Sequence, residues 1–125
     1  MTARILVVDD IAANVKLLEA KLSAEYYEVI TADNGRAALE IAETKAPDII
    51  LLDVMMPGMD GIETLDGLRR LPELDAVPMV FMTAKVQPRE ETALREAGAV
   101  DVIPKPFDPL TLADEVRAIW TRHAG

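Results

Sequence analysis

The chain has 125 residues and a formal net charge of −9. This is the size of a single domain, and its charge argues against nucleic acid or anionic lipid as a direct partner, because phosphate groups are bound by clusters of lysine and arginine. The absence of cysteine excludes disulfides and thiolate metal sites, and the content of 50% hydrophobic but only 4% aromatic residues predicts an aliphatic core. We also find no signal-peptide pattern and no apolar stretch near the roughly 18 residues of a membrane span, so we expect a cytoplasmic protein with no membrane partner.

Short strand-like segments alternate along the chain with segments whose apolar residues recur at helical spacing. The segments that predict strands are 5–8, 28–31, 49–52, 79–82 and 100–103. Segment 28–31 is the least apolar of them, which is typical of a strand at the edge of a sheet. The first predicted helix covers roughly residues 12–25.

Local signals predict where the other helices begin and end. Asn34 is a suitable cap for the second helix, and Pro47 stops it. Pro88 suits the first position of the fourth helix, and Gly98 ends that helix. Asp108 with Pro109 predicts the start of the fifth. The residues expected on the inner faces are Val15, Leu18 and Leu22; Ala38, Leu39 and Ala42; Ile62, Leu65 and Leu68; and Leu112, Val116, Ile119 and Trp120.

This alternation predicts an α/β fold that occupies residues 1–125 as one domain. Strands separated by helices of about 10–15 residues form a parallel sheet with right-handed crossovers. We therefore expect a doubly wound five-stranded parallel sheet with five helices and the flavodoxin-like strand order 2-1-3-4-5. In that order the first and third strands flank the point where ligands bind.

Polar residues follow four of the predicted strands: Asp9 and Asp10, Asp53, Thr83 and Lys105. Taken singly, each has an ordinary explanation, such as a helix cap, a loop carboxylate, a strand former or a surface lysine. The carboxyl ends of parallel strands meet at one edge of the sheet, however, so these residues should converge. Three carboxylates, a hydroxyl and an ammonium are the groups of a magnesium-dependent phosphoaspartate site.

The chain resembles the receiver domains of two-component response regulators, which are CheY-like, over its whole length. The residues that carry the resemblance are Val7-Val8-Asp9-Asp10, the stretch from Leu51 to Gly61, Thr83-Ala84 and Lys105-Pro106-Phe107. Each piece is a weak motif alone, but together and in this order they are specific. The first 61 residues are especially similar to the receiver of PleD-type regulators.

The resemblance implies a phosphorelay module in which Asp53 accepts a phosphoryl group from a histidine kinase or a histidine phosphotransfer protein. It implies that Mg²⁺ is held by Asp10, Asp53 and the backbone carbonyl of Met55, with Asp9 close by or acting through water. The module would be a signalling switch rather than an enzyme, either standing alone or forming part of a longer regulator.

The resemblance also gives roles to three residues beside the phosphoryl group. Lys105 would pair with Asp53 at rest and with a phosphoryl oxygen afterwards, aimed by a cis Lys105-Pro106 peptide, and it is the only cation expected at the site. Thr83 would donate a hydrogen bond to another phosphoryl oxygen. The small side chain of Ala84 would leave the approach open.

One position departs from the family pattern. Most relatives have Tyr or Phe three residues before the lysine, whereas this chain has Val102. A valine can shift little, so we expect the loop after the fourth strand and the fourth helix to move more than the fifth strand on phosphorylation. A downstream effector or a second receiver would bind the surface formed by the fourth helix, fifth strand and fifth helix, where Leu110 and Trp120 offer apolar contact.

Two alternatives come from other functional classes. The chain could be a scaffolding receiver that binds partners without phosphorylation, although the complete set of acids argues against this. It could also be a flavodoxin-like enzyme or flavin carrier. That would need a phosphate-binding loop after the first strand, where Asp9 and Asp10 would repel a phosphate in the absence of a metal.

Overall fold

The computed structural model describes residues 3–84 and 87–123. Its elements in chain order are β1 (Arg4–Val8), α1 (Ala12–Ser23), β2 (Glu28–Ala32), α2 (Gly35–Lys45), β3 (Ile49–Asp53), α3 (Gly61–Arg69), the short 3₁₀ helix η1 (Pro72–Leu74), β4 (Met79–Thr83), α4 (Pro88–Glu96), β5 (Asp101–Pro104) and α5 (Leu112–His123). None of the helices within these described ranges has the length and apolar character needed to cross a membrane. The loop after β4, which the sequence predicts to move, includes residues 85–86, outside the described part.

The strands form one parallel sheet in the order β2-β1-β3-β4-β5, which confirms the predicted fold class and strand order. The register of the inner strands places Val8 beside Leu52, Asp53 beside Met82, and Thr83 beside Pro104. The carboxyl ends of β1, β3, β4 and β5 therefore lie at nearly the same level. This is the edge at which the polar residues of the sequence were expected to meet.

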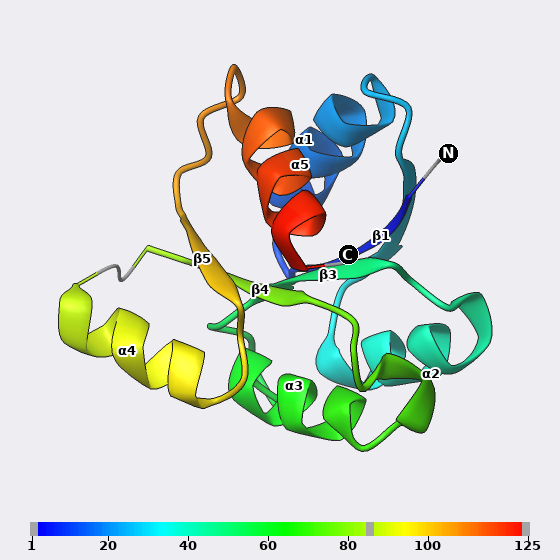
Figure 1. Cartoon of the computed structure of the whole chain (residues 1–125), viewed down its shortest axis with the longest axis vertical. Coiled ribbons are helices and arrows are strands. Elements are labelled where there is room, and N and C mark those ends of the chain that lie inside the picture. The colour runs from blue at the N-terminus through cyan, green and yellow to red at the C-terminus, as the bar shows by residue number, and fades with distance from the viewer. Residues whose placement is uncertain (1–2, 85–86, 124–125) are drawn as a thin grey trace.

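Helices cover both faces of the sheet, with α1 and α5 on one side and α2, α3 and α4 on the other (Figure 1). Alternate residues of each inner strand point to opposite sides, so Leu6 and Val8 pack toward α2 to α4 while Ile5 and Val7 pack toward α1 and α5. Strands β1, β3 and β4 are buried almost throughout, which explains their continuous apolar sequences. The edge strand β2 is more exposed, as predicted.

Several helix ends confirm their sequence signals. The side chain of Asn34 accepts a hydrogen bond of 2.8 Å from the backbone N–H of Ala37 and caps α2. Helix α3 has in addition a reciprocal capping box of Asp60 and Glu63, which was not predicted from the sequence. Pro88 is the first residue of α4, and Gly98 just beyond that helix has a φ of 124°, which favours glycine.

The structure corrects three details of the prediction. Helix α1 ends at Ser23 instead of near residue 25, and α5 begins at Leu112 instead of at Asp108. Residues 108–111 form a turn in which Asp108 accepts hydrogen bonds from the backbone N–H groups of Leu110, Thr111 and Leu112. Ile62 is exposed, because the buried face of α3 begins one residue earlier and consists of Gly61, Thr64, Leu65 and Leu68.

Candidate functional site

The structure brings the predicted polar residues together at the carboxyl edge of the sheet. Asp9 and Asp10 follow β1, Asp53 ends β3, Thr83 ends β4, and Lys105 follows β5. Asp9, Asp53 and Thr83 are buried, Lys105 is half-buried and Asp10 is exposed. The convergence predicted from the strand ends is thus present in the fold.

The Lys105 ammonium lies between two carboxylates. Its Nζ atom is 3.0 Å from Oδ1 of Asp53 and 2.9 Å from Oδ2 of Asp9. Burial by itself would lower the pKa of Lys105, but the hydrogen bonds to Asp9 and Asp53 outweigh it and the pKa is raised. Lys105 therefore stays protonated at neutral pH and links β5 to both acids. The sequence predicted the contact with Asp53 but not the one with Asp9.

Asp9 is held rigidly by its own neighbours. Its Oδ1 accepts a hydrogen bond of 2.9 Å from the backbone N–H of Ile11, and its Oδ2 accepts one of 3.2 Å from Nδ2 of Asn14. Asn14 was not predicted from the sequence. Its only signal is that it is a polar residue in the first turn of the helix that follows Asp9 and Asp10. Because its oxygens are engaged in this way, Asp9 is less available to a cation than the exposed Asp10.

Burial dominates the electrostatics of Asp53. It raises the pKa of Asp53 from the ordinary 3.8 to about 6, against the hydrogen bond from Lys105, and the charges of Asp9 and Asp10 raise it further. At neutral pH the group is still ionised, but its charge is costly. A bound cation or an added electrophile would relieve that cost.

The three carboxylates could hold a metal ion. Asp9, Asp10 and Asp53 each offer an oxygen, and these oxygens lie within 4.8 Å of one another. Hard oxygen ligands in small number suit Mg²⁺, which keeps several waters and takes few carboxylates. The donor set therefore fits the ion that the sequence predicted.

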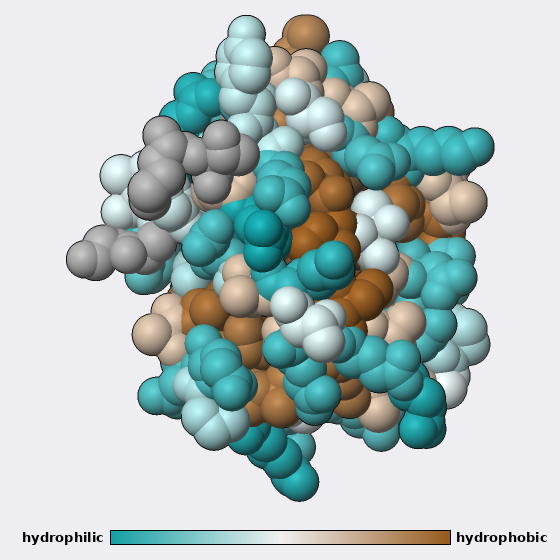
Figure 2. Space-filling model, turned by 90° about the vertical axis from the view of Figure 1, so that its right-hand side faces the viewer, coloured by the Kyte–Doolittle hydropathy of each residue, from teal (hydrophilic) through white to brown (hydrophobic). Residues whose placement is uncertain are grey.

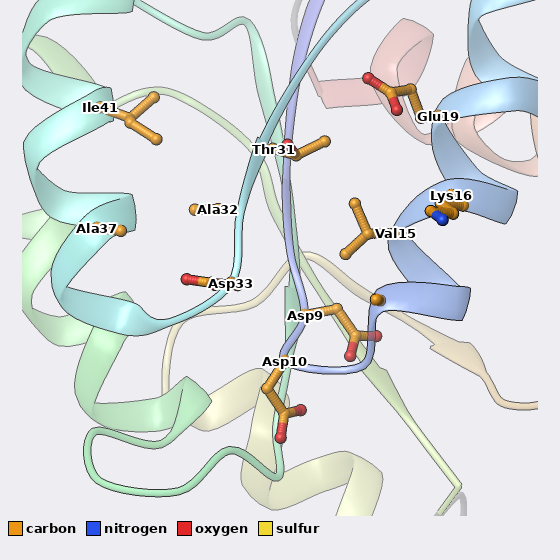
Figure 3. A pocket seen from close by; sticks show the side chains of 11 residues that line it. Asp9, Asp10, Val15, Lys16, Glu19, Thr31, Ala32, Asp33, Ala37 and Ile41 are labelled. Carbon is orange, nitrogen blue, oxygen red and sulfur yellow. The ribbon is translucent and has the colours of Figure 1, made fainter.

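A hollow of about 490 Å³ opens beside Asp9 and Asp10. Figure 3 shows Val15, Lys16 and Glu19 from α1 on one side of it and Ala37 and Ile41 from α2 on the other. The hollow leaves Asp10 exposed to solvent, whereas Asp9 beside it is buried. Lys16 of α1 also lines the hollow, whereas the cation that pairs with Asp9 and Asp53 is Lys105.

The remaining predicted site residues lie around Asp53. Met55 is two residues after Asp53, and its side chain is exposed. Ala84, which directly follows Thr83, is also exposed. The peptide bond from Lys105 to Pro106 is cis, as expected, and the Lys105 backbone N–H donates a hydrogen bond of 2.9 Å to the carbonyl of Thr83.

Gly61 brings the loop after β3 back against the strand end. A Cβ atom at this position would collide with the backbone carbonyl of Asp53, so only glycine permits this approach. The backbone N–H of Gly61 donates a hydrogen bond of 2.9 Å to the carbonyl of Val54. This hydrogen bond joins the two ends of the loop that carries Met55.

Comparison with known proteins gives consistent results. Residues 5–117 match the model of the response regulator receiver domain. The response regulator PleD of Caulobacter vibrioides is 52% identical over 119 residues, which are 95% of this chain and 26% of PleD. The alkaline phosphatase synthesis regulator PhoP of Bacillus subtilis is 43% identical over 98% of this chain and 50% of its own length. The chain thus spans half or less of the length of these two curated relatives.

Solved structures show the same architecture. The chemotaxis response regulator CheY4 of Vibrio cholerae superposes with a TM-score of 0.91 at 31% identity, covering 95% of this chain and 99% of CheY4. The receiver domain of a sensor histidine kinase from Pseudomonas aeruginosa superposes with a TM-score of 0.84 at 31% identity, covering 100% of this chain and 99% of that domain. That domain was solved with a magnesium ion coordinated in its active site cleft.

Proposed function

The chain belongs to the response regulator receiver domain family, and we propose that it works by accepting a phosphoryl group on Asp53 from a histidine kinase or a histidine phosphotransfer protein. The observation that carries this proposal is the position of Lys105, whose ammonium is within 3.0 Å of Asp53 and Asp9 in a cluster of three carboxylates. Among these acids, only Asp53 is both buried and at the end of a central strand. The flavin-carrier alternative finds no support, since the matched family is one of signalling switches.

The transfer needs a nucleophile and compensation of charge. An oxygen of Asp53 attacks the phosphorus atom, the bond from phosphorus to the donor's imidazole nitrogen breaks, and the imidazole leaves with the electron pair and takes up a proton. Lys105 lies close enough to Asp53 to contact an oxygen of the transferred group. The hydroxyl of Thr83 would donate a hydrogen bond to another phosphoryl oxygen, and the small Ala84 would leave the approach open; the position of Thr83 at the end of the neighbouring strand β4 supports this.

Mg²⁺ is the cofactor that this donor set fits. Asp10 and Asp53 would hold it, together with the backbone carbonyl of Met55, and Asp9 would act close by or through water. When bound, the ion supplies the positive charge that lets a carboxylate and a phosphoryl group approach each other. Lys105 leaves Asp10 free for this role, because its ammonium contacts Asp9 and Asp53.

We propose that the output passes through the surface of α4, β5 and α5 to a downstream effector or a second receiver. Leu110 and Trp120, which were expected to offer apolar contact there, lie instead on the side of α5 toward α1, so that expectation was wrong: Leu110, 87% exposed, lines a hollow with Lys21, and Trp120 lines one with Tyr26 and Tyr27. Arg95 of α4 and Arg122 of α5 both bind Asp101 of β5, at 2.9 Å and 3.2 Å. This network joins the three elements, so a shift of α4 would be transmitted to β5 and α5.

In this proposal the chain is a switch that promotes its own phosphorylation and dephosphorylation, and not an enzyme acting on other molecules.

Acetyl phosphate with Mg²⁺ tests the assignment of Asp53. Intact-mass and peptide mass spectrometry should find one phosphoryl group on Asp53 in the parent and none in Asp53→Asn. Asp33→Asn is a matched control, because Asp33 is an exposed carboxylate that lines the hollow beside Asp9 and Asp10. A phosphoryl group on another residue, or equal labelling of Asp53→Asn and the parent, would refute the assignment.

A further inference from the structure

Asn14 lies beside the acids but has no role in the proposed phosphoryl transfer. Hydrophilic side chains cover much of the molecular surface, as Figure 2 shows for the side of the molecule at the right of Figure 1. A polar residue in the first turn of a surface helix such as α1 is ordinarily one of these solvated groups. Asn14 is half-buried instead, and its amide is directed at Asp9, with Nδ2 3.2 Å from Oδ2. The contact therefore needs an explanation other than solubility.

Asn14 and Lys105 share one oxygen of Asp9. Oδ2 of Asp9 accepts the hydrogen bond from Asn14 and lies 2.9 Å from Nζ of Lys105. Oδ1 of the same carboxylate accepts a hydrogen bond of 2.9 Å from the backbone N–H of Ile11. Because Asp9 is fully buried, a rotation of its carboxylate would leave at least one of these donors without a partner. The orientation of Asp9 is therefore fixed both from the start of α1 and from the end of β5.

This orientation separates the two adjacent acids. Figure 3 shows the carboxylate of Asp9 turned toward the start of α1 and that of Asp10 turned away from it. Asp9 thus contacts Lys105 and Asn14, while Asp10 is exposed and can take a cation. The amide of Asn14 adds a donor without adding a charge. A lysine or arginine at this position would instead compete with Lys105 for Asp9.

The position of Asp9 matters most once Asp53 is esterified. At rest Lys105 pairs with two carboxylates, at 2.9 Å from Asp9 and 3.0 Å from Asp53. In an aspartyl phosphate the carboxylate charge of Asp53 is gone and the phosphoryl oxygens carry negative charge instead. Asp9 is then the carboxylate of this pair that still holds the ammonium at the site, where it can contact a phosphoryl oxygen. The donors that orient Asp9 therefore also determine the position of Lys105.

We propose that Asn14 is a positioning residue for phosphoryl transfer, whose amide keeps Asp9 turned toward Lys105 and away from the cation site. The inference rests on the proposed function, since it takes Asp53 as the phosphoacceptor and Asp10 with Asp53 as the cation ligands. Without the amide, Asp9 can turn toward the cation and become a direct ligand. The cation site then has a further carboxylate, whereas Lys105 loses its fixed partner. Loss of the Asn14 amide should therefore strengthen the binding of Mg²⁺ and slow the transfer.

Asn14→Leu tests the proposal, because leucine is close to asparagine in size and cannot donate a hydrogen bond. In titration calorimetry without phosphodonor, we expect this variant to bind Mg²⁺ about threefold more tightly than the parent does. With acetyl phosphate at saturating Mg²⁺, intact-mass spectrometry should show labelling of Asp53 that is about tenfold slower. Asn14→Ala also lacks the donor and suits a helix, so it should show the same two changes. Their opposite directions are decisive, since a folding defect would weaken binding and labelling together.

Asn34→Leu is the matched control. Asn34 is the other asparagine of the chain, and its side chain caps α2 by accepting a hydrogen bond of 2.8 Å from the backbone N–H of Ala37. Its replacement should lower stability but leave the Mg²⁺ affinity and the labelling rate within about twofold of the parent. Unchanged or weaker Mg²⁺ binding in Asn14→Leu, an unchanged labelling rate, or the same two changes in Asn34→Leu would overturn the inference. If the parent is labelled on Asp53, each of these results leaves the proposed function standing, whereas a parent without label on Asp53 would overturn both.

Discussion

Replacing Asp53 by Asn should stabilise the protein in the absence of divalent cations, and the gain should depend on pH. Asp53 is almost fully buried, and its pKa is raised to about 6, chiefly by that burial. Asn has nearly the same shape, and its Oδ1 atom can still accept the hydrogen bond from Lys105. The variant therefore removes a buried charge and leaves the packing of the site in place.

The magnitude follows from the pKa values. A carboxyl whose pKa is 3.8 in the unfolded chain and about 6 in the folded one binds its proton more tightly when folded. Between these values the folded state holds more protons, so the stability that Asp53 contributes falls as the pH rises from about 4 to about 6 and is constant above. At about 1.4 kcal/mol per pH unit, the full loss is about 3 kcal/mol. The pKa of about 6 already includes the favourable interaction with Lys105, so we expect a net gain of up to about 3 kcal/mol above pH 6.5.

Urea unfolding followed by circular dichroism in EDTA, at intervals from pH 4 to 8, measures this gain. The difference in unfolding free energy between Asp53→Asn and the parent should be small at pH 4, increase up to about pH 6, and then level off. Asp66→Asn is the control. Asp66 is an exposed carboxylate of α3 that pairs with Arg70 just beyond the end of that helix, so its replacement should change stability by less than about 0.5 kcal/mol at every pH.

Two results would refute this reasoning. If Asp53→Asn were no more stable than the parent at pH 7.5, the buried charge would not be costly in the folded protein. If the variant were more stable by the same amount at pH 4 and at pH 7, the gain would come from packing or from the unfolded state instead of from ionisation.

Three further predictions concern the site and its response. Asp10→Asn should also raise the stability of the cation-free protein, but by less than Asp53→Asn does, because Asp10 is exposed. The same variant should lose most of its Mg²⁺ binding in calorimetry. A variant less stable than the parent would contradict this prediction. Lys105→Ala should still be labelled by acetyl phosphate, but its NMR shifts on addition of BeF₃⁻ should be smaller than those of the parent; shifts of equal size would show that another group transmits the signal. In hydrogen exchange with and without BeF₃⁻, residues 83–87 and α4 should change more than β5, and changes confined to α1 and α2 would contradict the proposed output surface.

Most of the fold could be predicted because the chain gives consistent local signals. The continuous apolar runs of β1, β3 and β4 are typical of strands buried on both faces, and the structure buries them almost completely. The errors are at helix ends. Ile62 has the spacing of an inner residue, but Gly61 packs against the carbonyl of Asp53, and this contact turns the helix so that Ile62 faces outward.

The site was predictable in composition but not in detail. The positions of Asp9, Asp53, Thr83 and Lys105 after their strands were sufficient to place them at one edge. The division of roles between the two adjacent acids followed only from the family resemblance, which gave Asp10 as the direct ligand of Mg²⁺. The structure adds a physical reason, because the hydrogen bonds of Ile11 and Asn14 engage Asp9, which is buried beside Lys105, while Asp10 is exposed.

The packing of α4 is the reason for expecting this helix to respond most to phosphorylation. Leu94 is its single buried residue among those described, whereas α5 buries Leu112, Val116 and Ile119. A mainly apolar hollow of about 240 Å³ lies between α4 and the ends of β3 and β4, lined by Thr83 and Met55 among others, so the first turns of α4 have space to move. Val102 of β5 is half-buried against the core on the α4 side. A valine side chain is small and can shift little, so we expect little movement of β5 on its account. If phosphorylation of Asp53 displaces Thr83, α4 should therefore move more readily than β5.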